Sequence, residues 1–198
     1  MLERRLVVVA YTAVGALGAG ITLALGHDPL RTVAPTLGAV AARGHLFADG
    51  VSALGGLGIA AAAIVSARIF VARFSWARAL HESLAGVVRG TSDFDVVIAA
   101  LASGIGEELL FRGLLTQTLG VVISSVIFGA LHQVRGPARL AWALWAGVMG
   151  LLLGGLFVAT GSLVGPIVAH VVTNAINLRF VRDHNATPPP RTLASLMR

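Results

Sequence analysis

The sequence predicts an all-α polytopic membrane protein, and three observations carry that prediction. Hydrophobic residues make up 56% of the 198 residues and charged residues only 12%, about half the charged fraction of a soluble domain. The mean hydropathy is +0.84. Apolar stretches long enough to cross a bilayer follow one another along most of the chain. A soluble globular protein is excluded, because so few charged side chains could not cover its surface.

The first three segments are two apolar runs and one segment of mixed polarity. Leu6–Gly26 is interpreted as a retained transmembrane helix, because it is longer than an ordinary signal-peptide core and lacks a convincing cleavage site. The run from about Gly50 to Phe74 is rich in alanine and glycine, which lets membrane helices pack closely. Trp76–Arg89 is predicted to be an amphipathic segment on the membrane surface.

Four more apolar stretches follow Asp93, which brings the expected number to about six transmembrane helices in one bundle. They cover about Phe94–Leu119, Gly120–Gln133, Leu140–Thr160 and Leu163–Val181. The second of them is short for a span, so we expect it to tilt or to end below the membrane surface. We divide the chain into N-terminal helices with the amphipathic segment (1–92), a catalytic helical core (93–182) and a disordered tail (183–198).

Arginine supplies all the basic side chains, and its distribution predicts an orientation. With both termini in the cytoplasm, Arg31 and Arg43 face outward, Arg112 lies within a span, and every other arginine is cytoplasmic, as the positive-inside rule requires. We therefore expect a multi-pass protein of the inner (plasma) membrane. Its expected partners are the lipid bilayer and a membrane-embedded protein or peptide, and we expect no nucleic-acid partner.

Three charged side chains occur together inside the third apolar stretch, where each is costly. Glu108 and Arg112 have the i,i+4 spacing, with the acid first, that favours a helical ion pair. A structural pair explains these two residues. It does not explain Glu107, which lies about 100° around the helix from Glu108.

The later helices supply polar partners at a matching depth. Phe128 and His132 are four residues apart near the end of one stretch, and His170 and Asn174 are four apart in the last. At about 1.5 Å per residue, Glu107, His132, His170 and Asn174 each lie roughly 12 to 20 Å from the outer ends of their helices. An isolated intramembrane histidine or asparagine often only joins helices, but four residues at one depth permit a single site.

This set of residues suits hydrolysis. A carboxylate in a low-dielectric site can act as a general base toward water, and histidine or asparagine can donate hydrogen bonds to an oxyanion. The histidines are accompanied by no serine or cysteine in a nucleophile motif, and the chain has no cysteine and no His-Glu-x-x-His motif. We expect no cofactor, although Glu107, His132 and His170 could together hold zinc.

The motifs Glu107-Glu108-x-x-x-Arg112, Phe128-x-x-x-His132 and His170-x-x-x-Asn174, in this order on successive helices, resemble those of the CPBP family. This family, also called the Abi family, comprises CAAX-protease and bacteriocin-processing intramembrane endopeptidases and includes the Rce1-type proteases. The resemblance covers about Phe94–Val181. It implies peptide-bond hydrolysis in a membrane-embedded or membrane-anchored substrate, in C-terminal processing, in the sorting of surface proteins or in peptide maturation.

The resemblance also implies a role for each motif residue. Glu107 with His132 activates the attacking water, His170 and Asn174 form the oxyanion site, and Glu108, Arg112 and Phe128 support them. Family members have been described both as metal-independent glutamate proteases and as metalloproteases, and we favour the former. Two alternatives remain: a catalytically idle member acting as an immunity or scaffold protein, and a small transporter that uses the same ionisable groups.

Overall fold

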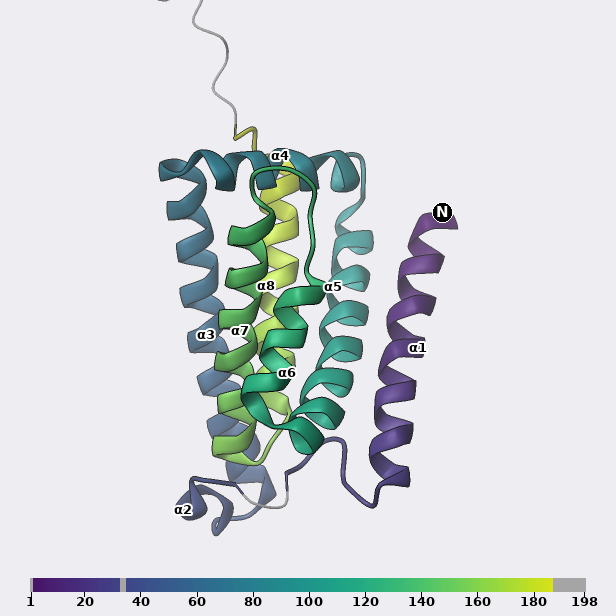
Figure 1. Cartoon of the computed structure of the whole chain (residues 1–198), viewed down its shortest axis with the longest axis vertical. Coiled ribbons are helices and arrows are strands. Elements are labelled where there is room, and N and C mark those ends of the chain that lie inside the picture. The colour runs from purple at the N-terminus through teal and green to yellow at the C-terminus, as the bar shows by residue number, and fades with distance from the viewer. Residues whose placement is uncertain (1, 33–34, 187–198) are drawn as a thin grey trace, which may run out of the picture.

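The computed structural model describes residues 2–32 and 35–186, and the regular elements of these residues are helices. In chain order they are α1 (Leu2–Ala24), α2 (Gly38–Ala41), α3 (His45–Arg73), α4 (Ser75–Val88), α5 (Asp93–Glu108), the π-helix η1 (Leu109–Thr116), α6 (Gln117–Leu131), α7 (Arg139–Thr160) and α8 (Val164–Asp183). The long helices stand side by side in one bundle (Figure 1). The predicted all-α membrane fold is confirmed.

Five of the described segments are long and apolar enough to cross a membrane, where about six transmembrane helices were expected. The difference lies in Asp93–Leu131, which contains two of the expected stretches. Gly120 interrupts it with φ 82° and ψ 166°, a backbone conformation that glycine adopts without steric cost. After this turn α6 runs back but ends partway along the bundle (Figure 1), so the short stretch does end below the surface.

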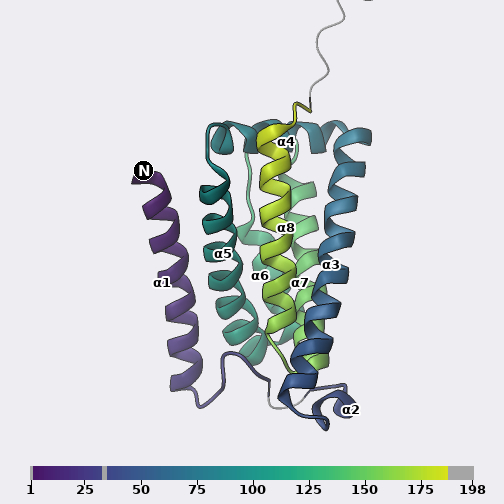
Figure 2. The same ribbon diagram turned by 180° about the vertical axis from the view of Figure 1, so that it is seen from behind.

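Helix α4 lies across one end of the bundle, which we call the α4 end (Figures 1 and 2). Phe74, with an extended backbone (φ −119°, ψ 134°), separates it from α3. Its buried face consists of Ala77, Leu80, His81 and Ala85. The predicted amphipathic surface segment is therefore confirmed, with bounds that differ by one residue at each end. Helix α1 begins and α8 ends at this same end.

Small residues set the helix contacts, as the composition of the second apolar run predicted. A Cβ at Gly56 of α3 would overlap the main chain of Gly165 of α8, and one at Gly165 would overlap Ser52. At the other side of the bundle, a Cβ at Gly106 of α5 would overlap the main chain of Tyr11 of α1. Such close backbone approach replaces the hydrophobic effect as a source of packing energy in a membrane.

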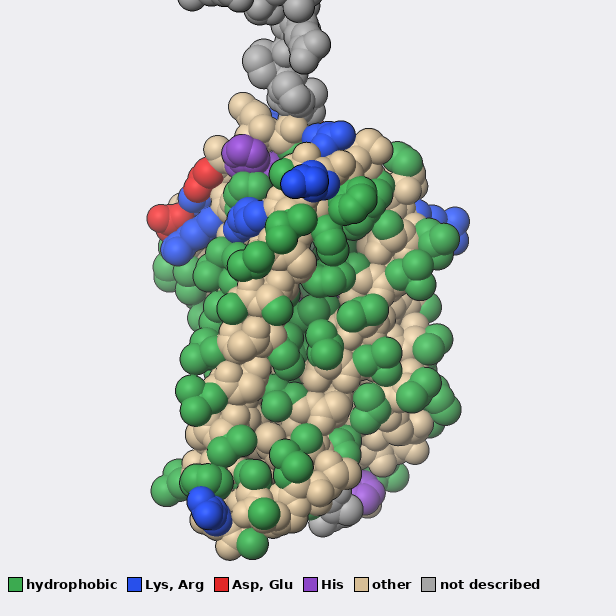
Figure 3. All heavy atoms as spheres, turned by 90° about the vertical axis from the view of Figure 1, so that its left-hand side faces the viewer, with side chains coloured by type: hydrophobic (Ala, Val, Ile, Leu, Met, Phe, Trp, Pro, Cys, Tyr) green, Lys and Arg blue, Asp and Glu red, His purple; other side chains and the backbone are tan. Residues whose placement is uncertain are grey.

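The long side of the bundle seen in Figure 3 carries mainly hydrophobic side chains and backbone. Charged side chains gather near the α4 end, and a single basic patch is visible at the opposite end. This banding is what a spanning bundle requires. The cytoplasmic placement of the termini and the division at residues 92 and 182 stay predictions, and residues 187–198 of the expected tail lie outside the described part.

The start of α3 and the presence of α2 differ from the expectation for physical reasons. Helix α3 begins at His45 rather than near Gly50, because the carboxylate of Asp49 is paired with Arg31 and need not lie outside the helix. The short helix α2 was not predicted, since its four residues form less than two turns.

Candidate active site

The predicted site residues come from four elements, α5, η1, α6 and α8. Glu107 and Glu108 end α5, Arg112 lies in η1, His132 follows the last residue of α6, and His170 lies in α8. The eight-residue π-helix is the unusual element, because π-helical turns are rare and frequently occur at functional sites. It follows Glu108 directly, and the structure brings all five of these residues together at mid-bundle.

Glu108 is fully buried and binds two partners. Its Oε1 atom accepts hydrogen bonds from Arg112 NH1 and from His170 Nδ1, each at 2.7 Å. The Arg112 side chain is 1% exposed and that of Glu108 is 0% exposed. Burying one charge without the other would cost several kcal/mol, so the two residues form a unit. The predicted ion pair is present, and it also holds His170, a contact that the sequence did not reveal.

Arg112 is fixed by further contacts. Its NH2 group donates to the carbonyl oxygen of Gly150 on α7 at 3.3 Å, and its guanidinium lies 4.8 Å from the centre of the Phe128 ring. The Phe128 ring in turn packs edge-on against Phe111 at 4.7 Å and next to His132 at 4.2 Å. Arg112 thus ties η1, α6 and α7 together.

Both histidines have their Nδ1 atoms occupied. His132 Nδ1 is 2.7 Å from the carbonyl oxygen of Phe128, and His170 Nδ1 is 2.7 Å from Glu108. A carbonyl or carboxylate oxygen can only accept, so each Nδ1 carries the proton and donates it. In a neutral imidazole the Nε2 atom then holds a lone pair.

The two Nε2 atoms face Glu107. Its Oε2 atom lies 3.7 Å from His132 Nε2 and 3.8 Å from His170 Nε2. These distances exceed those of a direct hydrogen bond, and Oε2 is buried without a hydrogen-bond partner among the described residues. Each of the two adjacent glutamates has one such oxygen, since Glu108 Oε2 is also buried without a hydrogen-bond partner among the described residues. They differ in that Glu108 is held through its Oε1 atom, whereas the free oxygen of Glu107 is the one that faces both Nε2 atoms.

Asn174 does not join this contact set in the way the sequence suggested. Its side-chain amide donates to the hydroxyl of Ser103 on α5 at 3.1 Å. It lies one helical turn beyond His170 on the same face of α8. Sequence reasoning missed Ser103, because a serine in an apolar helix usually bonds to its own backbone.

Helix α1 also reaches the site, which the sequence gave no reason to expect. The main chain of Tyr11 packs against Gly106, and its phenol is close enough to interact electrostatically with the Glu107 carboxylate. Tyr11 is the only tyrosine in the chain. A lone tyrosine in an apolar run carries no spacing signal, so only the packing of α1 against α5 identifies it.

The donor types around Glu107 are ones that zinc accepts, namely two imidazole Nε2 atoms and a carboxylate. Their Nδ1–H groups are held by acceptors, as they commonly are in metal-bound histidines. Nevertheless, no three histidine, aspartate or glutamate side chains of the described residues are arranged to hold a metal ion. A zinc ion at Glu107, His132 and His170 would therefore require these side chains to move.

Comparisons with known proteins find similarity to one family over the helices that carry the motifs. The family model described as type II CAAX prenyl endopeptidase Rce1-like matches residues 89–176. "Uncharacterized protein YpbD" of Bacillus subtilis (strain 168) is 32% identical over 81 residues. That alignment covers 41% of this chain and 42% of the relative, so the chain spans less than half the length of the relative. No solved structure matches. Residues 89–176, which carry every site residue named above except Tyr11, are thus similar to the type II CAAX prenyl endopeptidase Rce1-like family.

Proposed function

We propose that this protein is an intramembrane endopeptidase that hydrolyses a peptide bond in a membrane-embedded or membrane-anchored protein or peptide. The observation that carries the proposal is the position of the Glu107 carboxylate. It faces two histidine Nε2 atoms whose rings are each fixed through Nδ1. A transporter has no comparable need to fix both imidazole tautomers around one carboxylate.

In the proposed reaction Glu107 acts as the general base. A water molecule donates one hydrogen to Glu107 and the other to the Nε2 lone pair of His132, which orients its oxygen toward the scissile carbonyl carbon. As the oxygen–carbon bond forms, the first proton passes to Glu107. Glu107 then delivers it to the leaving amine as the peptide bond breaks, so protons balance over the cycle.

His170 and Asn174 stabilise the oxyanion in this proposal. When His170 carries both protons, Nδ1 donates to Glu108 and Nε2 is free to donate to the developing negative charge. The charges of Glu107, Glu108, Arg112 and doubly protonated His170 then sum to zero, which favours this arrangement in a low-dielectric bundle. Asn174, held by Ser103 through one amide hydrogen, offers the other.

We further propose that the reaction needs no metal, because the residues divide into a base pair and an oxyanion pair with each member used. The metal alternative would use Glu107, His132 and His170 as zinc ligands, with zinc supplying Lewis-acid activation of water. Protein purified without added metal is to be analysed for zinc and assayed after exhaustive chelation. Full activity without stoichiometric zinc is expected, and activity lost on chelation and regained with zinc would contradict the metal-free mechanism.

The endopeptidase itself is tested by incubating the protein in nanodiscs with a library of hydrophobic peptides and membrane-anchored reporters. Mass spectrometry then identifies new termini. We expect cleavage by the natural protein and none by Glu107→Gln. Products that form equally with both proteins would show that Glu107 is not the base. Binding of a peptide without cleavage, by both proteins, would favour a scaffold or immunity role.

A further inference from the structure

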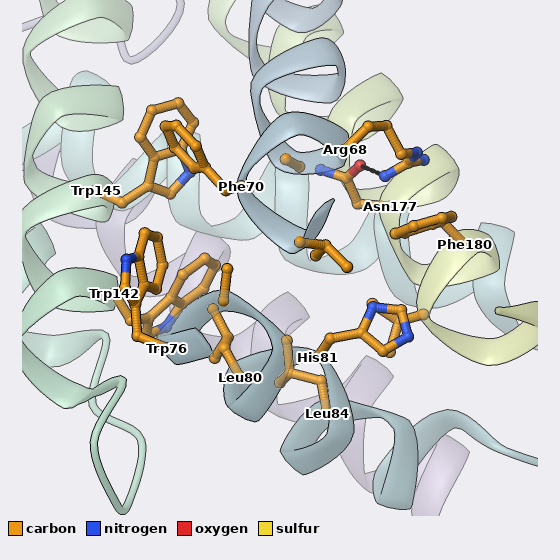
Figure 4. A pocket seen from close by; sticks show the side chains of 14 residues that line it. Arg68, Phe70, Trp76, Leu80, His81, Leu84, Trp142, Trp145, Asn177 and Phe180 are labelled. Atoms are coloured by element: carbon orange, nitrogen blue, oxygen red, sulfur yellow. Dashed lines mark hydrogen bonds between the residues drawn. The ribbon is translucent and has the colours of Figure 1, made fainter. Parts of the chain in front are cut away.

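An open pocket with a cavity volume of about 110 Å³ lies at the α4 end of the bundle, between α3, α4, α7 and α8. Fourteen residues line it, and the figure shows them as sticks (Figure 4). They include all three tryptophans of the chain (Trp76, Trp142 and Trp145) together with Phe70 and Phe180. The lining contains one arginine, Arg68, and no aspartate or glutamate. The pocket is therefore apolar with a single fixed positive charge.

The guanidinium of Arg68 contacts neutral groups only, among the contacts of the described residues. Its guanidinium lies 3.6 Å from the centre of the Phe180 ring and donates to the side-chain oxygen of Asn177 at 2.9 Å and to the carbonyl of Ile176 at 3.4 Å. No ion pair of the described residues includes Arg68. An arginine in a spanning helix is costly unless its charge is compensated. The remaining N–H groups of the guanidinium can bind an anion, and phosphate is a preferred partner.

The pocket lies at the depth of lipid head groups. Arg68 is five residues from the end of α3, which places it about 7–8 Å below that end at 1.5 Å per residue. Tryptophan is enriched at this level of a bilayer. The amphipathic helix α4 closes the pocket on the side toward the membrane surface, with Leu80 and Leu84 facing into it (Figure 4).

The lining suits an acyl chain better than a polypeptide. A peptide backbone inside a membrane needs a partner for every N–H and C=O group, whereas most of the lining side chains offer none. An acyl chain makes no such demand. The tryptophans and Phe70 lie on the α7 side of the pocket, and Arg68 with Asn177 lies on the α8 side (Figure 4). The apolar wall of the pocket is thus separated from its cationic group, as the acyl chain of a lipid is separated from its phosphate.

We propose that this pocket binds an anionic phospholipid, with its phosphodiester on Arg68 and one acyl chain against Trp142, Trp145 and Phe70. Basic pockets between transmembrane helices are known to bind anionic head groups. The proposal is independent of hydrolysis at Glu107. Because the Trp142 ring lies 6.2 Å from that of His132, the bound lipid forms a wall adjoining the candidate active site.

The test measures lipid binding by the full chain in detergent, by native mass spectrometry and by thermal unfolding. The probes are dioleoylphosphatidylglycerol, dioleoylphosphatidylcholine with the same chains, and inorganic phosphate. We expect one tightly bound phosphatidylglycerol per protein and a higher Tm, at least tenfold weaker binding of phosphatidylcholine, and no effect of phosphate. Equal binding of the two lipids would overturn the proposal, and so would a Tm rise with phosphate alone.

Variants locate the binding site. Arg68→Gln is expected to weaken phosphatidylglycerol binding at least tenfold. The matched control is Arg43→Gln, which removes an arginine stacked on Phe47 at 5.0 Å, outside this pocket, and is expected to change nothing. Should Arg68→Gln fail to fold, Ala67→Leu narrows the pocket while keeping the charge, and is expected to release the lipid too. Unchanged binding in a folded pocket variant would refute the assignment, as would displacement of the lipid by a cleaved substrate peptide, which would assign the pocket to the substrate.

Discussion

Two polar clusters join the spanning helices, and they differ in the groups that they bring together. The mid-bundle cluster contains Glu107, Glu108, Arg112, His132 and His170. The second, which we call the Asp49 cluster, contains Arg31, Asp49, Ser52, Thr160 and Ser162 at the end opposite α4. Both join several helices, but only the mid-bundle cluster contains histidine.

The Asp49 cluster consists of closed pairs. The carboxylate of Asp49 lies 2.7 and 2.8 Å from Arg31 nitrogens and also accepts from the Ser162 hydroxyl. The buried hydroxyl of Ser52 donates to the carbonyl of Ser162 and accepts from Thr160 and from the amide of Gly165. These contacts fix the segment around Arg31 against α3 and the turn between α7 and α8, which is a structural task.

The mid-bundle cluster contains such a closed part and an open part side by side. Glu108, Arg112 and His170 are paired at 2.7 Å through Glu108 Oε1, whereas the Glu107 oxygen beside the two Nε2 atoms has no hydrogen-bond partner among the described residues. Glu108 Oε2 is also without a partner, but only the Glu107 oxygen faces both Nε2 atoms. Polar residues in a membrane helix therefore do not by themselves indicate chemistry. A buried acceptor that faces two imidazole nitrogens does.

The largest expected effect is a loss of kcat on replacing Glu107, and it distinguishes this residue from the paired residues around Glu108 and from the Asp49 cluster. Glu107→Gln keeps the side-chain shape, and its amide can donate to the histidine Nε2 lone pairs, so the Tm should stay within a few degrees. Loss of the general base should lower kcat by about 10³-fold or more, equivalent to about 4 kcal/mol of transition-state stabilisation. Peptide-cleavage kinetics and thermal unfolding in the same detergent check this prediction. A Glu107→Gln protein with the natural rate would remove the basis of the mechanism.

Breaking the pair of Glu108 and Arg112 should lower the stability of the protein as well as its activity. Arg112→Ala leaves Glu108 buried without its counter-charge, which costs about 3–5 kcal/mol and lowers the Tm by on the order of 10 °C. The paired replacement of Glu108→Leu with Arg112→Met should recover much of that stability. It should not recover activity, since His170 loses its acceptor. An unchanged Tm in Arg112→Ala would contradict the bracing role.

The Asp49 cluster should show the opposite pattern. Asp49→Asn weakens a partly exposed pair with Arg31, so we expect a loss of about 1 kcal/mol of stability and a kcat within about twofold of the natural protein. Thermal unfolding and cleavage kinetics measure the two quantities. A large loss of kcat with the fold intact would show that this cluster contributes to the reaction and would end the distinction drawn here.

The smallest expected effect concerns Asn174. Ser103→Ala removes the hydroxyl that holds its amide, and one lost hydrogen bond of about 1 kcal/mol corresponds to roughly fivefold in rate. We expect kcat to fall by about that factor with KM and Tm nearly unchanged. Ser66→Ala is a matched control, because the Ser66 hydroxyl bonds only to the main chain of its own helix. Equal effects of the two changes would exclude a specific role for Ser103.

Much of the fold followed from the sequence because a bilayer imposes simple rules. Each of the long helices was predicted, and the amphipathic α4 was placed within one residue at either end. The membrane fixes the length and polarity of spanning segments, so local composition was sufficient. Five described segments are long and apolar enough to cross, against about six expected, because two of the expected stretches form one continuous segment in which the chain turns back at Gly120.

The candidate site was predicted in part, for a related reason. The i,i+4 spacing of Glu108 and Arg112 makes their pairing a local property of one helix, and matching depths brought Glu107, His132 and His170 to one layer. Neither the spacing nor the depth of a residue in the sequence predicts which side chain of another helix it contacts. The bonds from His170 to Glu108 and from Asn174 to Ser103 depend on how α8 rotates against α5.

The sequence by itself determined which segments span the membrane, which residues carry charge into it, and how deep those residues lie. These properties depend on composition and on rise per residue, which are the same in any packing. Only the tertiary structure decided which of two adjacent glutamates is held and which is left available. That choice depends on side-chain directions 100° apart on one helix, and therefore on which neighbouring helix each direction meets. Glu108 meets Arg112 and His170, which both bind its Oε1 atom, and Glu107 meets two Nε2 atoms, neither of which is within hydrogen-bond distance of its Oε2 atom.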